Sequence, residues 1–243
     1  VLSTGAMNLS WAYYGLEELL QYQVPKVIVL ETYLYDVHAR NATYTPIART
    51  IYGNDLIGAI PAMTSVMDLS KIPFAWSPLI RYHDQWNQPI SQYYNKITTD
   101  YPSTNWRWDG YEFQTTIVGH VKYDNYLGTL NPTRPIAKYY PSYTEKILAL
   151  GEQYNVPIIF VKVPAVDCYG VYDEAVSQII NNAGGTFYDF NTLYIDETRY
   201  LKTHFMDAGG IPVNSHQNNI GAIKSSVFLA DLIAESTVIT VDE

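Results

Sequence analysis

The chain has 243 residues, of which 47% are hydrophobic and 16% are charged, enough to bury the core of one domain or of a domain with an excursion. Its formal charge of −9, from 15 basic and 24 acidic residues, argues against nucleic acid or an anionic membrane surface as a partner, because both require clustered Lys and Arg. The single cysteine, Cys168, excludes an intrachain disulfide and a cysteine-based zinc site, and no apolar run reaches the roughly 18 residues of a membrane span.

Two elements are predicted near the start of the chain. Asn8 is a polar cap that leads into a helical pattern of leucines, and this helix is expected to end near Gln23. The apolar and β-branched run of residues 26–31 then predicts a short strand that is buried on both faces. A helix followed by a buried strand is half of a βαβ unit.

The middle of the chain, from about 36 to 140, departs from this alternation. It contains a helical segment near 55–67, a Trp- and Tyr-rich helix around 79–97 and a β-like stretch at 113–123. A long excursion between two core strands is often a cap that shapes a substrate cleft, and an oligomer contact is the alternative.

The alternation of helix and strand returns in the last hundred residues. The pattern predicts helices over 143–154, 172–182 and 220–234, and strands over 156–163 and 186–190. We therefore expect an α/β fold, a three-layer sandwich with a mostly parallel sheet and a long middle insertion.

Polar loops follow several of the predicted strands and are the candidates for a functional site. In open parallel sheets the chemistry lies at the carboxyl ends of the strands. The opening segment Ser3-Thr4-Gly5, the strand end Glu31-Thr32-Tyr33, the loop at 164–167 and the loop at 203–222 before the last helix are in this position.

Two of these segments carry a resemblance to a known family. Residues 186–232, with Phe-Met-Asp-Ala-Gly at 205–209, His-Gln-Asn at 216–218 and Gly-Ala at 221–222, resemble the C-terminal block of the bacterial SGNH/GDSL-type hydrolases. Leu-Ser-Thr-Gly-Ala at 2–6, a helix and the strand at 26–31 are similar to the second block of the same family. The resemblance implies one SGNH-like, flavodoxin-like domain over 1–243, with a cap-like insertion at about 36–140.

The family resemblance also implies roles for individual residues. His216 would be the general base and Asp207 the acid that orients it, because a serine hydroxyl attacks only when a neighbouring histidine takes its proton. Gly5 would donate its backbone amide to the oxyanion. Thr4, Glu31 and Asn218 would line the oxyanion site or the pocket.

The chain departs from the family pattern in two respects. The family keeps its Asp and His three residues apart, whereas Asp207 and His216 are nine apart, and Val213 occupies the minus-three position. The family's serine lies ahead of the segment that matches 2–6, together with the first strand. Either the natural protein carries both upstream of Val1, where any targeting segment would also lie, or this copy lacks the nucleophile and is not a hydrolase.

Two functions of different classes follow from these observations. The first is an esterase or acyltransferase that uses a Ser-His-Asp type mechanism on O-acyl groups, in particular acetyl groups, of an extracellular or cell-envelope glycan. The second is a catalytically silent SGNH-like domain that binds carbohydrate or serves assembly.

Neither function requires a cofactor, and no His-x-x-x-His or Cys-x-x-Cys pair indicates a metal. The 23 tyrosines and five tryptophans are compatible with a glycan or an acylated small molecule as substrate, and the oligomeric state stays open.

Overall fold

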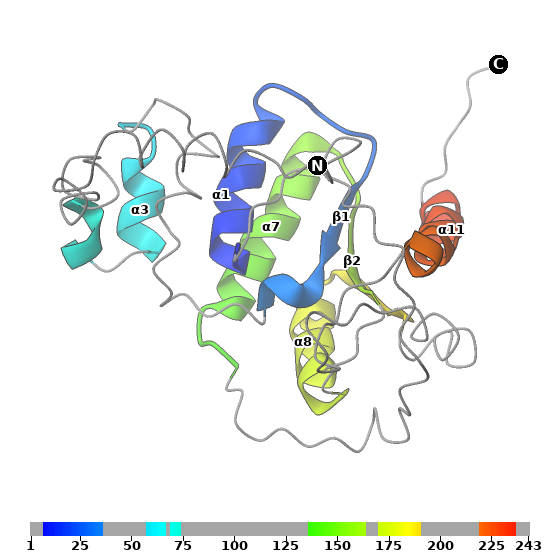
Figure 1. The fold of residues 1–243 in the computed structure, drawn as a ribbon. Helices are drawn as coiled ribbons and strands as arrows, with labels where there is room; N and C mark the ends of the chain where they lie inside the picture. The colour runs from blue at the N-terminus through cyan, green and yellow to red at the C-terminus, as the bar shows by residue number, and fades with distance from the viewer. Residues whose placement is uncertain are drawn as a thin grey trace, which may run out of the picture. The chain divides into compact units, whose positions relative to one another are not determined.

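The computed structural model describes residues 7–35, 57–66, 69–73, 136–163, 170–190 and 219–236, which Figure 1 draws as coloured ribbon. The chain divides into two units, one formed by Val1–Glu18 with Val37–Phe113 and the other by Leu19–Asp36 with Gln114–Glu243. Each unit is described by itself. The predicted aromatic helix at 79–97 and the β-like stretch at 113–123 lie outside the described residues.

Helices make up the described part of the first unit. Helix α1, Leu9–Leu20, extends by its last two residues into the second unit. The Asn8 side-chain oxygen accepts a hydrogen bond from the Trp11 backbone N–H at 3.1 Å, which confirms the predicted cap. Helix α3, Ile60–Val66, and the 3-10 turn η2, Leu69–Lys71, follow in the chain. The helix predicted near 55–67 is thus present in a shorter form.

The second unit contains a parallel sheet. Strands β1, Ile28–Glu31, β2, Ile158–Lys162, and β3, Thr186–Asp189, pair in the order β1-β2-β3, and both pairings are parallel. The helical elements of this unit are the 3-10 turn η1, Thr32–Tyr35, and helices α7, Tyr140–Tyr154, α8, Gly170–Asn182, and α11, Asn219–Ser236. The predicted α/β class and the parallel direction of these strands are confirmed.

Burial differs sharply between the two predicted apolar strands. All five residues of β2 are buried, as its apolar sequence predicts. In β1 only Ile28 is buried and the following three residues are partly exposed, so the prediction of a strand buried on both faces is wrong for β1. The difference follows from position, because β2 has a strand on each side whereas β1 has one neighbour among the described strands.

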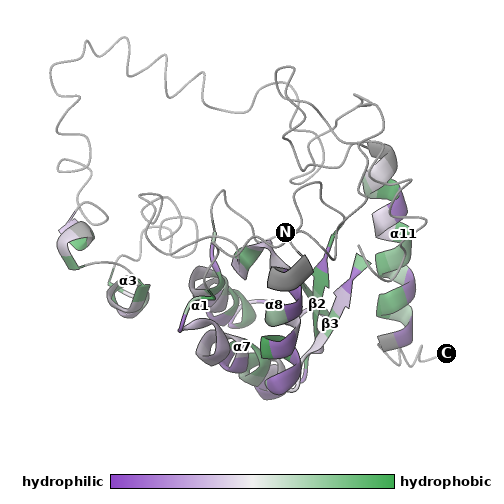
Figure 2. Ribbon diagram, turned by 90° about the horizontal axis from the view of Figure 1, so that it is seen from below, coloured by the Kyte–Doolittle hydropathy of each residue, from purple (hydrophilic) through white to green (hydrophobic). Residues whose placement is uncertain are grey.

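Helices pack on both faces of the sheet. On one face, Ile159 and Val161 form an apolar cluster with Leu232 of α11, and Phe228, Leu229 and Ile233 of the same helix pack around it. On the other face, Gly151 of α7 lies so close to Ile158 that a Cβ at Gly151 would come within 2.9 Å of the Ile158 side chain. Figures 1 and 2 show α7 and α8 on one side of the strands and α11 on the other. Side chains alternate along β2, so the two helical layers receive alternate residues of this strand.

Two of the helices end in the same way before a strand. Asn155 after α7 has a φ of 53° and Gly184 after α8 a φ of 83°, both left-handed. In each turn a backbone N–H reaches back five residues, from Val156 to the Gly151 carbonyl at 2.8 Å and from Gly185 to the Ile180 carbonyl at 2.9 Å. These are the bonds of the Schellman motif, and they turn the chain from the helix into the following strand.

Within the described ranges, no helix is both long and apolar enough to cross a membrane.

Candidate functional site at the carboxyl edge of the sheet

The three strands end in charged residues at one edge of the sheet. Glu31 ends β1, Lys162 ends β2 and Asp189 ends β3, and in the strand register Lys162 stands opposite Asp189. Parallel strands bring their carboxyl ends together, and ligands of open α/β sheets bind at this edge. The described part of the chain therefore places its candidate site here.

Glu31 joins the ends of two strands through its carboxylate. One oxygen, Oε2, accepts a hydrogen bond from the Tyr33 backbone N–H at 2.5 Å, and the other, Oε1, accepts one from the Val163 N–H at 3.4 Å. Hydrogen bonds to an ionised acceptor are stronger than those between neutral groups. The carboxylate of Glu31 thus fixes the turn after β1 relative to the residue that follows β2.

Lys162 forms a buried ion pair with Asp173. Its Nζ lies 3.7 Å from an Asp173 carboxylate oxygen, and the two side chains are only 5% and 6% exposed. Asp173 lies in the first turn of α8, so the pair ties the end of β2 to the start of the following helix. Burial of one of these charges alone would cost several kcal/mol, and the partner offsets this cost.

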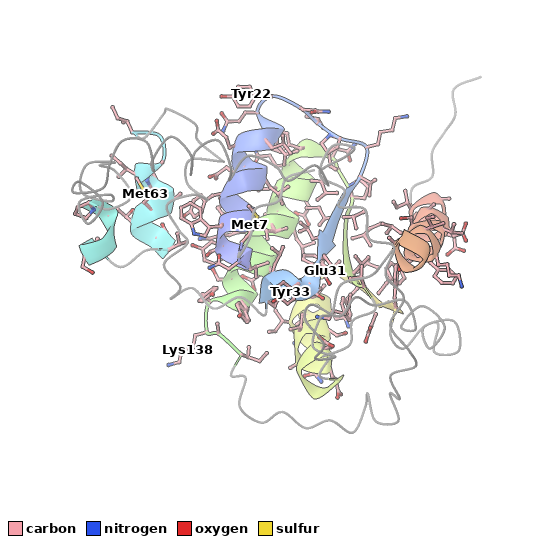
Figure 3. The ribbon with its side chains drawn as sticks, in the orientation of Figure 1. Met7, Tyr22, Glu31, Tyr33, Met63 and Lys138 are labelled. Atoms are coloured by element: carbon pink, nitrogen blue, oxygen red, sulfur yellow. The ribbon has the colours of Figure 1, made fainter. Side chains whose placement is uncertain are left out.

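The aromatic ring of Tyr33 lies over the same lysine. The Lys162 Nζ is 5.9 Å from the centre of the Tyr33 ring, within the range of a cation–π contact. Tyr33 itself is 56% exposed. Figure 3 shows Glu31 and Tyr33 close together where β1 passes into η1. The edge therefore combines a buried charge pair with an accessible aromatic ring.

Hydrogen bonds from helix α7 hold the turn η1 in place. The Tyr35 hydroxyl and the Thr144 hydroxyl are 2.8 Å apart, and the Tyr140 hydroxyl donates to the Tyr35 carbonyl. Tyr35 is completely buried, and burial raises the pKa of its phenol above the ordinary value. Because η1 carries Tyr33 as well, these buried bonds limit the movement of that residue.

The side chain of the neighbouring Thr32 is buried, and its hydroxyl takes part in none of the hydrogen bonds described above. It is 2% exposed, and within the described part of the chain its hydroxyl has no hydrogen-bond partner. A buried hydroxyl that lacks a partner costs about 1–3 kcal/mol. Thr32 is therefore the point at this edge where a water or ligand acceptor would bring the largest gain.

Of the residues that the sequence indicated for the site, Glu31 is the one that the structure describes. Its position at the carboxyl edge is as expected, and its carboxylate is engaged with backbone amides. Five others lie outside the described residues: Thr4, Gly5, Asp207, His216 and Asn218. None of the five histidines of the chain falls within the described ranges, so these ranges contain no serine–histidine pair.

Sequence reasoning missed Lys162, Asp173 and the role of Tyr33. A signal for the first was present, because a lysine in the otherwise apolar run 158–163 must either reach solvent or find a buried partner. In the ranges that the structure describes, no three His, Cys, Asp or Glu side chains are grouped so that they could hold a metal ion.

Comparisons of the chain with models of protein families, with curated proteins and with solved structures found no match.

Proposed function

We propose that the chain is the larger part of an SGNH-type α/β domain, a three-layer sandwich, that acts as an esterase or acyltransferase on O-acyl groups of a glycan. His216 is the general base and Asp207 its orienting acid, and Gly5 contributes an oxyanion donor. The glycan is extracellular or part of the cell envelope, and acetyl is the group that we propose to be transferred.

The observation that carries the proposal is the direction of helix α11. It begins at Asn219, three residues after His216 in the sequence, and packs on the sheet through Phe228, Leu229 and Leu232. In Figure 2 the C-terminal end of α11 lies opposite to the ends toward which the arrows of β2 and β3 point, so the start of the helix lies toward the edge at which the strands end. A residue just before such a helix is well positioned for chemistry at the carboxyl edge.

The charged edge gives further support. A base and its orienting acid act efficiently only when the surrounding backbone holds them in a fixed geometry. Glu31 and the Lys162–Asp173 pair connect β1, β2 and α8 at this edge by interactions that need no ligand. The edge is therefore a rigid base on which the proposed loop residues would act.

The test uses the natural protein, with any residues that are encoded before Val1. A fluorophosphonate probe is expected to label one serine, and the protein is expected to hydrolyse p-nitrophenyl acetate. His216→Ala should lower kcat/KM at least about 100-fold, because a general base contributes 10²- to 10⁴-fold. His204→Ala is the matched control and should keep the wild-type rate.

Two results would overturn the proposal in different ways. An unchanged rate in His216→Ala would remove this residue as the base. A folded wild-type protein that shows neither labelling nor turnover would exclude the hydrolase, and the alternative, a silent SGNH-like domain that binds carbohydrate or serves assembly, would take its place.

A further inference from the structure

Tyr33 differs from the other exposed tyrosine of the same segment in how it is held. Tyr22 is 79% exposed and precedes β1, whereas Tyr33 is 56% exposed and follows β1. Figure 3 shows Tyr22 just beyond the end of α1 and Tyr33 where β1 passes into η1. Single exposed aromatic residues are common on protein surfaces, so exposure alone gives Tyr33 no function.

Two interactions hold Tyr33, one through its backbone and one through its ring. Its backbone N–H donates to Glu31 at 2.5 Å, and its ring stands 5.9 Å from the Lys162 ammonium. The lysine is itself immobilised by Asp173 and almost fully buried. These contacts restrict the ring before a ligand arrives, so a ligand that stacks on it loses less conformational entropy.

The charge around Tyr33 indicates which ligands suit it. The ammonium near the ring is paired with Asp173, and the neighbouring strand ends carry the carboxylates of Glu31 and Asp189, so no unpaired positive charge among these residues attracts an anion. The chain as a whole carries −9, which disfavours an anionic ligand at long range. A neutral ligand with one flat apolar face and a polar rim matches an accessible tyrosine, whose ring is apolar and whose hydroxyl forms hydrogen bonds.

We propose that Tyr33 is the aromatic platform of a sugar-binding subsite, on which a neutral pyranose ring of the glycan stacks at the carboxyl edge of the sheet. The choice of a glycan rests on the proposed function. The subsite determines affinity for the sugar chain, while the acyl chemistry belongs to other residues.

The test measures sugar binding and acyl turnover separately. Binding of xylotetraose, cellotetraose and chitotetraose to the natural protein is measured by calorimetry, for the wild type and for Tyr33→Ala, Tyr33→Phe and Tyr22→Ala. Tyr33→Ala is expected to weaken binding of the preferred sugar about tenfold, since an aromatic contact of this kind contributes on the order of one factor of ten. Tyr33→Phe keeps the ring and should stay within about twofold, and Tyr22→Ala should match the wild type.

Turnover of p-nitrophenyl acetate, which has no sugar, distinguishes this proposal from the proposed function. Tyr22→Ala, which lies outside the edge, should keep the wild-type kcat/KM for this substrate. If the wild type hydrolyses no ester but binds sugar, and Tyr33→Ala binds it more weakly, the result supports the subsite and excludes the esterase. The subsite is overturned if Tyr33→Ala binds as tightly as the wild type, or if the folded wild type binds none of the three sugars.

Discussion

The Lys162 ammonium lies 3.7 Å from the Asp173 carboxylate, and both side chains are more than nine-tenths buried. The pair connects the last residue of the central strand to the first turn of the next helix. A buried pair of this kind is strongly destabilising when it is broken, although an apolar pair of the same size is often tolerated.

We therefore expect Lys162→Met to lower the free energy of unfolding by about 3–5 kcal/mol, because it leaves Asp173 buried without a counter-charge. The double variant Lys162→Met with Asp173→Leu should recover most of this loss. Urea denaturation measures both values. Lys138→Met, at an exposed position just before α7, is the control and should change the value by less than about 0.5 kcal/mol. A single variant as stable as the control would contradict the burial of the pair.

Burial of Tyr35 predicts a loss of stability at alkaline pH. Its pKa is raised in the folded protein, chiefly by burial, so above about pH 10 the unfolded chain releases the proton while the folded chain keeps it. Stability is then fully present below pH 10 and falls as the pH rises, by up to about 1.4 kcal/mol per pH unit from this residue.

Denaturation curves between pH 8 and 11.5 test this expectation with two variants. Tyr35→Phe removes the titrating group and should show a shallower alkaline decline than the wild type. Thr144→Val removes the hydroxyl that lies 2.8 Å from Tyr35 but keeps the buried phenol. It should be less stable at neutral pH and keep the alkaline decline, and equal slopes in the wild type and Tyr35→Phe would refute the assignment.

Gly151 is required by a close approach between α7 and the strand after it. A Cβ at this position would stand 2.8 Å from the Val156 carbonyl oxygen and 2.9 Å from the Ile158 side chain. We expect Gly151→Ala to lower the free energy of unfolding by about 1–3 kcal/mol, as overpacking does elsewhere. Gln153→Ala, exposed on the same helix, is the control. A Gly151→Ala protein that is more stable than the wild type, as helix propensity alone would favour, would contradict this packing.

Thr32→Val tests the buried hydroxyl at the edge of the sheet. Valine fills nearly the same volume and removes a hydroxyl that has no hydrogen-bond partner in the described part of the chain. The free energy of unfolding should therefore rise by about 1 kcal/mol. Thr32→Ser keeps the hydroxyl and loses a methyl group, and should be less stable than the wild type. A loss of stability in Thr32→Val would mean that water or a ligand binds the hydroxyl in solution.

Local sequence patterns predicted much of the described fold. The apolar run that contains β2 and the cap at Asn8 are local signals, and each is confirmed within one or two residues. The burial of β1 could not be predicted in this way, because it depends on how many strands lie beside it.

The candidate site was predicted less completely, for a physical reason. Glu31 was recognised because it ends a strand, but its two hydrogen-bond donors belong to different strand ends. Lys162 and Asp173 are separated by a crossover, so neither residue indicates the other in the sequence. Contacts that form only when parallel strands and their helices assemble leave no periodic signal along the chain.

The position of Lys162 also favours the observed register of the central strand, β2, against its neighbours. Its neighbours Val161 and Ile159 point into the apolar cluster under α11, while Lys162 points to the opposite layer and Asp173. A shift of β2 by one residue would exchange these two sets and drive an ammonium group into the apolar cluster. The shifted sheet would contain an unpaired buried charge and would therefore have a higher free energy than the observed one. A single lysine thus favours the observed pairing of the three strands during folding.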